Sequence, residues 1–90
     1  MSFDPITIDS DVRGFLAENF ILDDGGASLD ANESLTQSGV LDSMGVLELI
    51  MFIEQQYGVT IPDEDTLPEN LDSVNRIVNY VSGRLALASA

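Results

Sequence analysis

The 90-residue sequence contains no cysteine, histidine or tryptophan, and its only basic residues are three arginines. Without thiols and imidazoles the chain cannot form a disulfide, and it lacks the ligands and bases of most zinc sites and catalytic centres. Carboxylates, hydroxyls and guanidinium groups are the reactive side chains that remain. We therefore expect no metal site, no catalytic residue and no enzymatic activity.

Basic residues are greatly outnumbered by acidic ones, three against 16, which gives a formal net charge of −13. Phosphate backbones and anionic lipid surfaces repel such a chain, so we expect neither nucleic acid nor membrane as a partner. A basic protein surface would instead be attracted and oriented by this charge. Alternatively, the acidic residues serve only to keep the domain soluble. Composition does not distinguish a basic partner from this second interpretation.

Long hydrophobic runs are absent as well. No stretch approaches the roughly 18 apolar residues of a membrane span, and the N-terminus "MSFDPITIDS" has neither the basic start nor the apolar centre of a signal peptide. The apolar content of 44% is enough for one small core. We expect residues 1–90 to form a single domain in a cytoplasmic monomer.

The apolar residues that are present recur at helical spacing. Their pattern predicts an all-α fold, a small antiparallel bundle of three main helices and one short helix. The first helix is expected over about residues 8–21 with Thr7 as its N-cap. The short helix is expected over 68–71 and the last helix over 73–83, followed by a disordered tail over 85–90.

The second helix, predicted over residues 43–57, is unusually apolar. Between Met44 and Ile53 only Gly45 and Glu48 are not apolar, which exceeds one buried stripe. Either this helix is covered on several sides, or part of its surface contacts a ligand or partner. Gly58 is expected to end it in the left-handed conformation.

A long segment rich in Gly, Ser, Asn and Asp precedes this helix. Residues 23–42 are predicted to be a loop, attached to the core by four apolar residues, Leu29, Leu35, Val40 and Leu41. Loops of this length within compact domains are uncommon unless they are functional or poorly ordered.

Ser43 stands where this loop meets the second helix, and two roles are open to it. A serine in this position can simply cap the helix by accepting a backbone N–H. Asp42 is equally available for capping, which would leave the Ser43 hydroxyl free. The positive end of a long helix would also favour a phosphate ester on that hydroxyl.

The segment Asp42-Ser43-Met44, followed by "GVLELI", resembles the acyl carrier protein family of phosphopantetheine-attachment domains, over about residues 7–82. Members carry a 4'-phosphopantetheine arm on the serine of an Asp-Ser-Leu signature and hold acyl groups as thioesters on the thiol of the arm. The resemblance implies that Ser43 is the attachment residue. The stretch "GVLDSMG" is similar to D-alanyl carriers and other freestanding acyl or aminoacyl carriers loaded by an ATP-dependent adenylating ligase.

The resemblance also implies three kinds of partner: a phosphopantetheinyl transferase, the adenylating ligase and a downstream acyl-accepting enzyme. Family members meet these enzymes largely through the second helix. The matching positions here are Asp42, Met44, Leu47, Glu48, Met51, Glu54 and Ile61. Packing in the core is the alternative role for the apolar members of this set.

Two other functions are compatible with the residues alone. An unmodified acidic adaptor would dock through Met44, Leu47 and Met51, with Ser43 serving only as a cap. A small enzyme could use paired carboxylates such as Asp42 and Glu48, although no acid/base pair at a defined spacing and no substrate cleft is recognisable.

Overall fold

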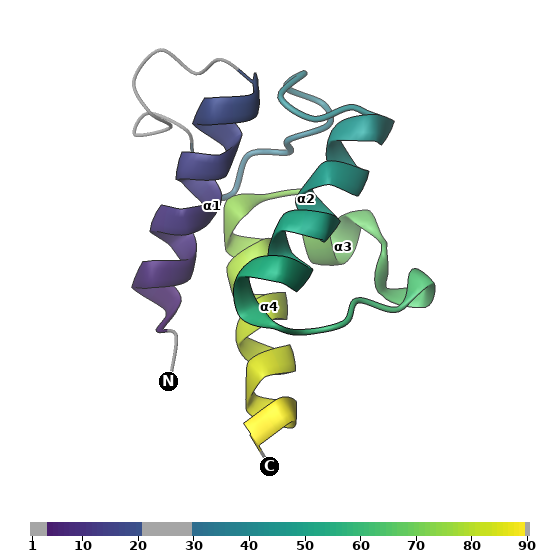
Figure 1. The fold of residues 1–90 in the computed structure, drawn as a ribbon. Coiled ribbons are helices and arrows are strands. Elements are labelled where there is room, and N and C mark those ends of the chain that lie inside the picture. The colour runs from purple at the N-terminus through teal and green to yellow at the C-terminus, as the bar shows by residue number, and fades with distance from the viewer. Residues whose placement is uncertain (1–3, 21–29, 90) are drawn as a thin grey trace.

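The computed structural model describes residues 4–20 and 30–89, which form helices joined by loops (Figure 1). The long helices are α1 (Pro5–Phe20), α2 (Ser43–Tyr57) and α4 (Val74–Ser89), and a four-residue helix, α3 (Pro68–Leu71), precedes α4. A 3-10 turn, η1, spans Asp63–Asp65. Helix α1 runs antiparallel to α2 and α4 (Figure 1). The predicted all-α bundle of three main helices and one short helix is confirmed.

Helix α1 begins three residues earlier than the apolar spacing indicated. Asp4 Oδ1 accepts a 2.7 Å hydrogen bond from the backbone N–H of Thr7, and this bond lowers the pKa of Asp4. Pro5 occupies the first helical position, where its missing N–H costs nothing. The prediction that Thr7 caps the helix is therefore wrong, because Asp4 performs that role. Residue 21, the predicted end, lies outside the described residues.

Helix α2 has the predicted bounds. Asp42 is its N-cap, and Gly58, with φ 67°, ends it in the left-handed conformation. The N–H of Gly58 donates to the carbonyl of Glu54 at 3.0 Å. Leu49 and Ile53 are fully buried.

Helix α4 continues well past its predicted end at residue 83. Alanine and leucine are strong helix formers, and residues 85–88 contain only these two. Leu85 packs against the core, and the Arg84 guanidinium donates to the carbonyl of Thr60 at 2.8 Å. The predicted disordered tail is therefore wrong for residues 85–89, and residue 90 lies outside the described part.

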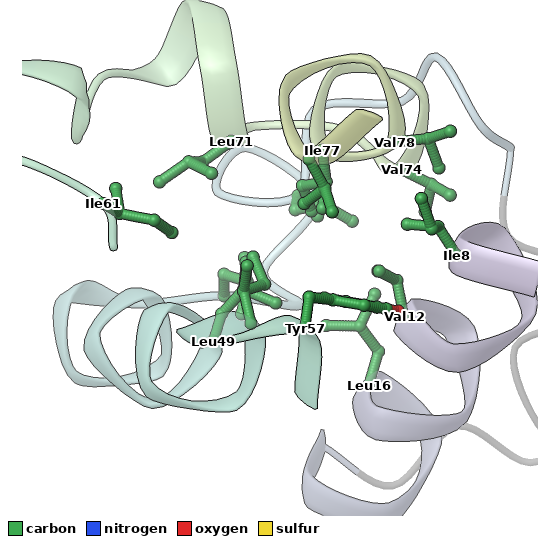
Figure 2. Packing of buried hydrophobic residues seen from close by; sticks show 14 of the residues in the cluster. Ile8, Val12, Leu16, Leu49, Tyr57, Ile61, Leu71, Val74, Ile77 and Val78 are labelled. Atoms are coloured by element: carbon green, nitrogen blue, oxygen red, sulfur yellow. The ribbon is translucent and has the colours of Figure 1, made fainter. Parts of the chain in front are cut away.

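The core lies where the three long helices meet. Figure 2 shows side chains of α1, α2 and α4 pointing toward one another, with Ile61 and Leu71 closing one end of the cluster. Two loop residues, Leu35 and Leu41, are buried in the same core as predicted, and Val40 packs against it. Leu29 lies outside the described residues.

Two tyrosine hydroxyls join separate elements. Tyr57 of α2 donates to Asp11 of α1 at 3.0 Å, and Tyr80 of α4 donates to Asp65 of η1 at 2.7 Å. Burial and these bonds raise the pKa of both tyrosines, that of Tyr80 to about 12. In the described ranges, no helix has the length and apolar character needed to span a bilayer.

Candidate functional site

Ser43 is the first residue of α2, and its side chain is exposed. The neighbouring Asp42 Oδ1 accepts the backbone N–H of Gly45 at 2.7 Å, so Asp42 is the capping side chain. Within residues 4–20 and 30–89, no hydrogen bond involves the Ser43 hydroxyl. Capping therefore does not account for Ser43, and its Oγ is free to react.

The backbone around Ser43 favours an anion. In the described structure the N–H groups of Ser43 and Met44 have no intramolecular acceptor, as expected for the first turn of a helix. These two N–H groups and the aligned peptide dipoles of the 15-residue helix give its beginning a partial positive charge. A phosphate ester on Ser43 Oγ would lie beside these donors.

A groove of about 430 Å³ begins beside Ser43, and we refer to it as the Ser43 groove. Val46 and Leu47 of α2 form part of its walls, together with Leu67 and Leu71. Hydroxyl groups and one carboxylate give it a polar part. Its lining comprises Thr36, Ser43, Val46, Leu47, Thr66, Leu67, Pro68, Leu71 and Asp72.

Asp72, which lies between α3 and α4, connects the long loop to this groove. Its carboxylate accepts hydrogen bonds from the hydroxyl of Ser34 and from both the N–H and the hydroxyl of Thr36. Burial by itself raises the pKa of Asp72, but these bonds and the charge of Arg76 hold it below its usual value. The carboxylate is therefore ionised at neutral pH.

Most of the predicted docking residues lie on one exposed stripe of α2. Met44, Leu47 and Met51 are 72%, 60% and 57% exposed, and Glu48 is exposed between them. Residues three and four apart share a helix face, so these side chains form one surface. We call Met44, Leu47, Glu48 and Met51 the α2 stripe. Asp42 lies exposed at the beginning of the same helix.

Two predicted docking residues have structural partners instead. Ile61 is only 6% exposed and belongs to the core, so the expectation that it contributes to the surface is wrong. Glu54 is half-buried, and its Oε2 accepts the backbone N–H of Ile61 at 2.9 Å. This bond folds the chain back after α2 and directs Ile61 inward.

Sequence reasoning missed three residues beside Ser43. Thr36 and Asp72 line the groove and bond to each other although they are 36 positions apart, a contact that no local pattern reveals. Leu67 is 43% exposed and lines the groove with Leu47. The sequence could have pointed to Leu67, because it is apolar and directly precedes the proline that begins α3. No His, Cys, Asp or Glu cluster suited to a metal ion occurs among the described residues.

Comparison with known proteins shows the family of this chain. The family described as "Phosphopantetheine attachment site" matches residues 16–81, and the chain belongs to this family. A D-alanyl carrier protein of Streptococcus suis (strain 05ZYH33) is 33% identical over 66 residues, which cover 73% of this chain and 81% of the relative. An acyl carrier protein of Campylobacter jejuni subsp. doylei is 32% identical over 71 residues, covering 79% and 87%. One of Helicobacter acinonychis (strain Sheeba) is 34% identical over 71 residues, covering 79% and 86%.

Family membership confirms the resemblance read from the sequence. The protein is a carrier and not an enzyme, and its prosthetic group is 4'-phosphopantetheine. The residues of the site fit that group, because a free exposed hydroxyl, two available N–H donors and a largely apolar groove lie together.

Proposed function

We propose that Ser43 is the residue that bears the phosphopantetheine, within a single carrier domain that transports an acyl or aminoacyl group. The observation that supports this proposal is the division of roles at the beginning of α2. Asp42 caps the helix, while the neighbouring Ser43 hydroxyl is exposed and without an intramolecular hydrogen bond in the described structure.

In the attachment reaction, Ser43 Oγ forms a bond to the phosphorus next to the pantetheine part of coenzyme A. The bond from that phosphorus to the bridging oxygen of the diphosphate breaks, and the adenine nucleotide part leaves. The proton of the hydroxyl passes to a base of the transferase. The N–H groups of Ser43 and Met44 would hold the phosphate of the attached group and stabilise its negative charge. The bound group supplies a thiol on which the cargo is held as a thioester.

The α2 stripe is the surface through which we propose that the transferase and other enzymes dock. Its exposed methionine and leucine side chains lie on the helix that begins with Ser43. Methionine adapts to differently shaped partners, which suits a carrier that meets several enzymes. Glu48 and the net charge of −13 favour basic partner surfaces, which steer association without requiring tight binding.

The cargo is proposed to be a carboxylic or amino acid that an ATP-dependent adenylating ligase loads and a downstream enzyme accepts. The names of the D-alanyl and acyl carrier relatives support this range. Attachment of the arm would consume coenzyme A and this mode of loading would consume ATP, which supports the proposal that the protein acts in the cytoplasm. The protein is proposed to act there as a monomer.

The test is incubation of the purified protein with coenzyme A and a broad-specificity phosphopantetheinyl transferase, followed by intact-protein mass spectrometry. We expect a mass increase of one phosphopantetheine group for the wild type and none for Ser43→Ala. Ser38→Ala is the matched control, because Ser38 is an exposed serine in the loop before α2. This variant should be modified like the wild type. Modification of folded Ser43→Ala would refute the proposal, and an unmodified wild type would favour an adaptor without a prosthetic group.

A further inference from the structure

We propose that Asp72 is a positioning residue for the attachment reaction, holding the loop before α2 so that Ser43 is presented in one place. The inference rests on the proposed role of Ser43. Asp72 does not contact the reacting atoms in this account. It acts through residues 34–36, which it fixes from a position between α3 and α4.

Asp72 makes a set of hydrogen bonds to the loop before α2. Its carboxylate accepts the hydroxyl of Ser34, the N–H of Thr36 at 2.9 Å and the hydroxyl of Thr36 at 2.8 Å. Its backbone carbonyl accepts the N–H of Leu35 at 2.8 Å. One residue thus binds three consecutive loop residues with four hydrogen bonds. The bonds to the ionised carboxylate are charge-assisted and therefore stronger than neutral ones.

The loop residues that Asp72 binds are connected to Ser43. The carbonyl of Leu35 accepts the N–H of Leu41 at 2.9 Å, and both leucine side chains are buried. Only Asp42, which caps α2, separates Leu41 from Ser43. The restraint that Asp72 imposes on Leu35 and Thr36 is therefore transmitted to the beginning of α2 through a continuous series of bonds.

Thr36, Ser43 and Asp72 all line the Ser43 groove. An enzyme that brings the diphosphate of coenzyme A to Ser43 Oγ must bind over this groove. If residues 34–36 were released, docking would have to order them again, at a cost in conformational entropy. Because this cost falls on association, KM should rise while kcat stays nearly unchanged.

Removal of the Asp72 carboxylate should release Ser34 and Thr36 without detaching the whole loop, because the backbone carbonyl of residue 72 still accepts the N–H of Leu35. The N–H of Asn75 donates to the carbonyl of Ala31 at 2.9 Å, and its side-chain amide donates to Asn32 Oδ1 at 2.7 Å. These bonds hold the start of the described loop to α4 independently of Asp72.

The experiment measures phosphopantetheine transfer to Asp72→Ala at varied carrier concentration. We expect KM to rise about tenfold, equivalent to about 1.4 kcal/mol, with kcat within a factor of about two of the wild type. Asp72→Asn keeps a carbonyl oxygen for the Thr36 donors and should give an intermediate KM. Amide hydrogen exchange should quicken at Thr36 and Leu41 in Asp72→Ala, which reports the loop independently of the reaction.

Asp11→Ala is the matched control. Asp11 also accepts a hydroxyl from a distant part of the sequence, that of Tyr57. Tyr57 ends α2, roughly 20 Å from Ser43 at 1.5 Å per helical residue. The control should lose stability and keep the wild-type KM. An equal rise in KM for both variants would show a general effect of destabilisation and overturn the inference, as would a KM for Asp72→Ala within twofold of the wild type.

If circular dichroism shows that Asp72→Ala does not fold, the double variant Ser34→Ala and Thr36→Val tests the same contact from the loop side. It removes both hydroxyl donors and leaves Asp72 in place, and it should also raise KM selectively. An unchanged KM overturns the inference. If the wild type itself accepts no phosphopantetheine, the proposed function fails first. If the wild type is modified while the Asp72 and Asp11 variants behave alike, only this inference fails.

Discussion

At the scale of single residues, the site depends on which of two neighbours caps the helix. Asp42 accepts the N–H of Gly45, while the hydroxyl of Ser43, the first residue of α2, is exposed. Both residue types favour helix N-caps, so the sequence offered either one for the role. The geometry decides it, because only the Asp42 oxygen lies against the N–H of Gly45. An exposed hydroxyl and a capped helix beginning are thereby present side by side.

Alkaline stability provides a test at the residue scale. Burial and the bond to Asp65 raise the pKa of Tyr80 to about 12 from its ordinary 10.0. A raised pKa means that the neutral hydroxyl is favoured in the folded state. Its contribution to stability is therefore complete below pH 10.0 and is lost as the pH rises toward about 12.

We expect Tyr80→Phe to reduce the fall in the free energy of unfolding between about pH 10 and about pH 12, measured by urea denaturation. Some dependence should remain, because the pKa of Tyr57 is raised as well. An identical pH dependence for the wild type and Tyr80→Phe would show that the hydroxyl of Tyr80 does not donate to Asp65 in solution.

At the scale of elements, α2 serves two surfaces at once. Leu49 and Ile53 are fully buried against the other helices, whereas the α2 stripe faces outward. The sequence left open whether the excess apolar residues of this helix were covered or served a partner. The structure shows that they are divided between the two environments, so the helix is both a core element and a candidate docking surface.

Leu47→Ala and Leu49→Ala separate these two surfaces with the same substitution two positions apart. Leu49→Ala should lower the free energy of unfolding by about 2–5 kcal/mol, because it opens a cavity in the core. Leu47→Ala should change stability by less than about 1 kcal/mol, because Leu47 is 60% exposed, yet it should raise the KM of phosphopantetheine transfer. Urea denaturation and the transfer assay measure both effects. An unaltered KM for Leu47→Ala would place docking away from the α2 stripe.

The helices and loops also show which features of the fold the sequence could predict. Helical periodicity and the glycine at position 58 were sufficient to place α2, because both signals act within a few residues. The end of α4 was missed because the segment after residue 83 was expected to be a disordered tail, although alanine and leucine continue a helix readily. The inward position of Ile61 depends on its bond to Glu54, which bends the chain back on itself. The contacts of Asp72 with Ser34 and Thr36 depend on the assembled fold and have no local signature.

At the scale of the whole molecule, the few basic groups are engaged internally. Arg13 pairs with Asp9 at 2.7 Å, and Arg84 donates to the carbonyl of Thr60 and lies 4.0 Å from Asp65. The remaining acids give the molecule its strongly negative field. Such a field suits brief, steered encounters between a carrier and basic enzymes. The small bundle thus combines a buried apolar core with a strongly acidic composition.

The central claim is tested most directly by locating the phosphopantetheine on the modified wild-type protein. Proteolysis and fragmentation mass spectrometry of the product assign the added group to one residue. The account predicts that it lies on Ser43 alone, with the neighbouring hydroxyls of Thr36, Ser38 and Thr66 unmodified. An added group on any other residue, with Ser43 unchanged, would contradict the account.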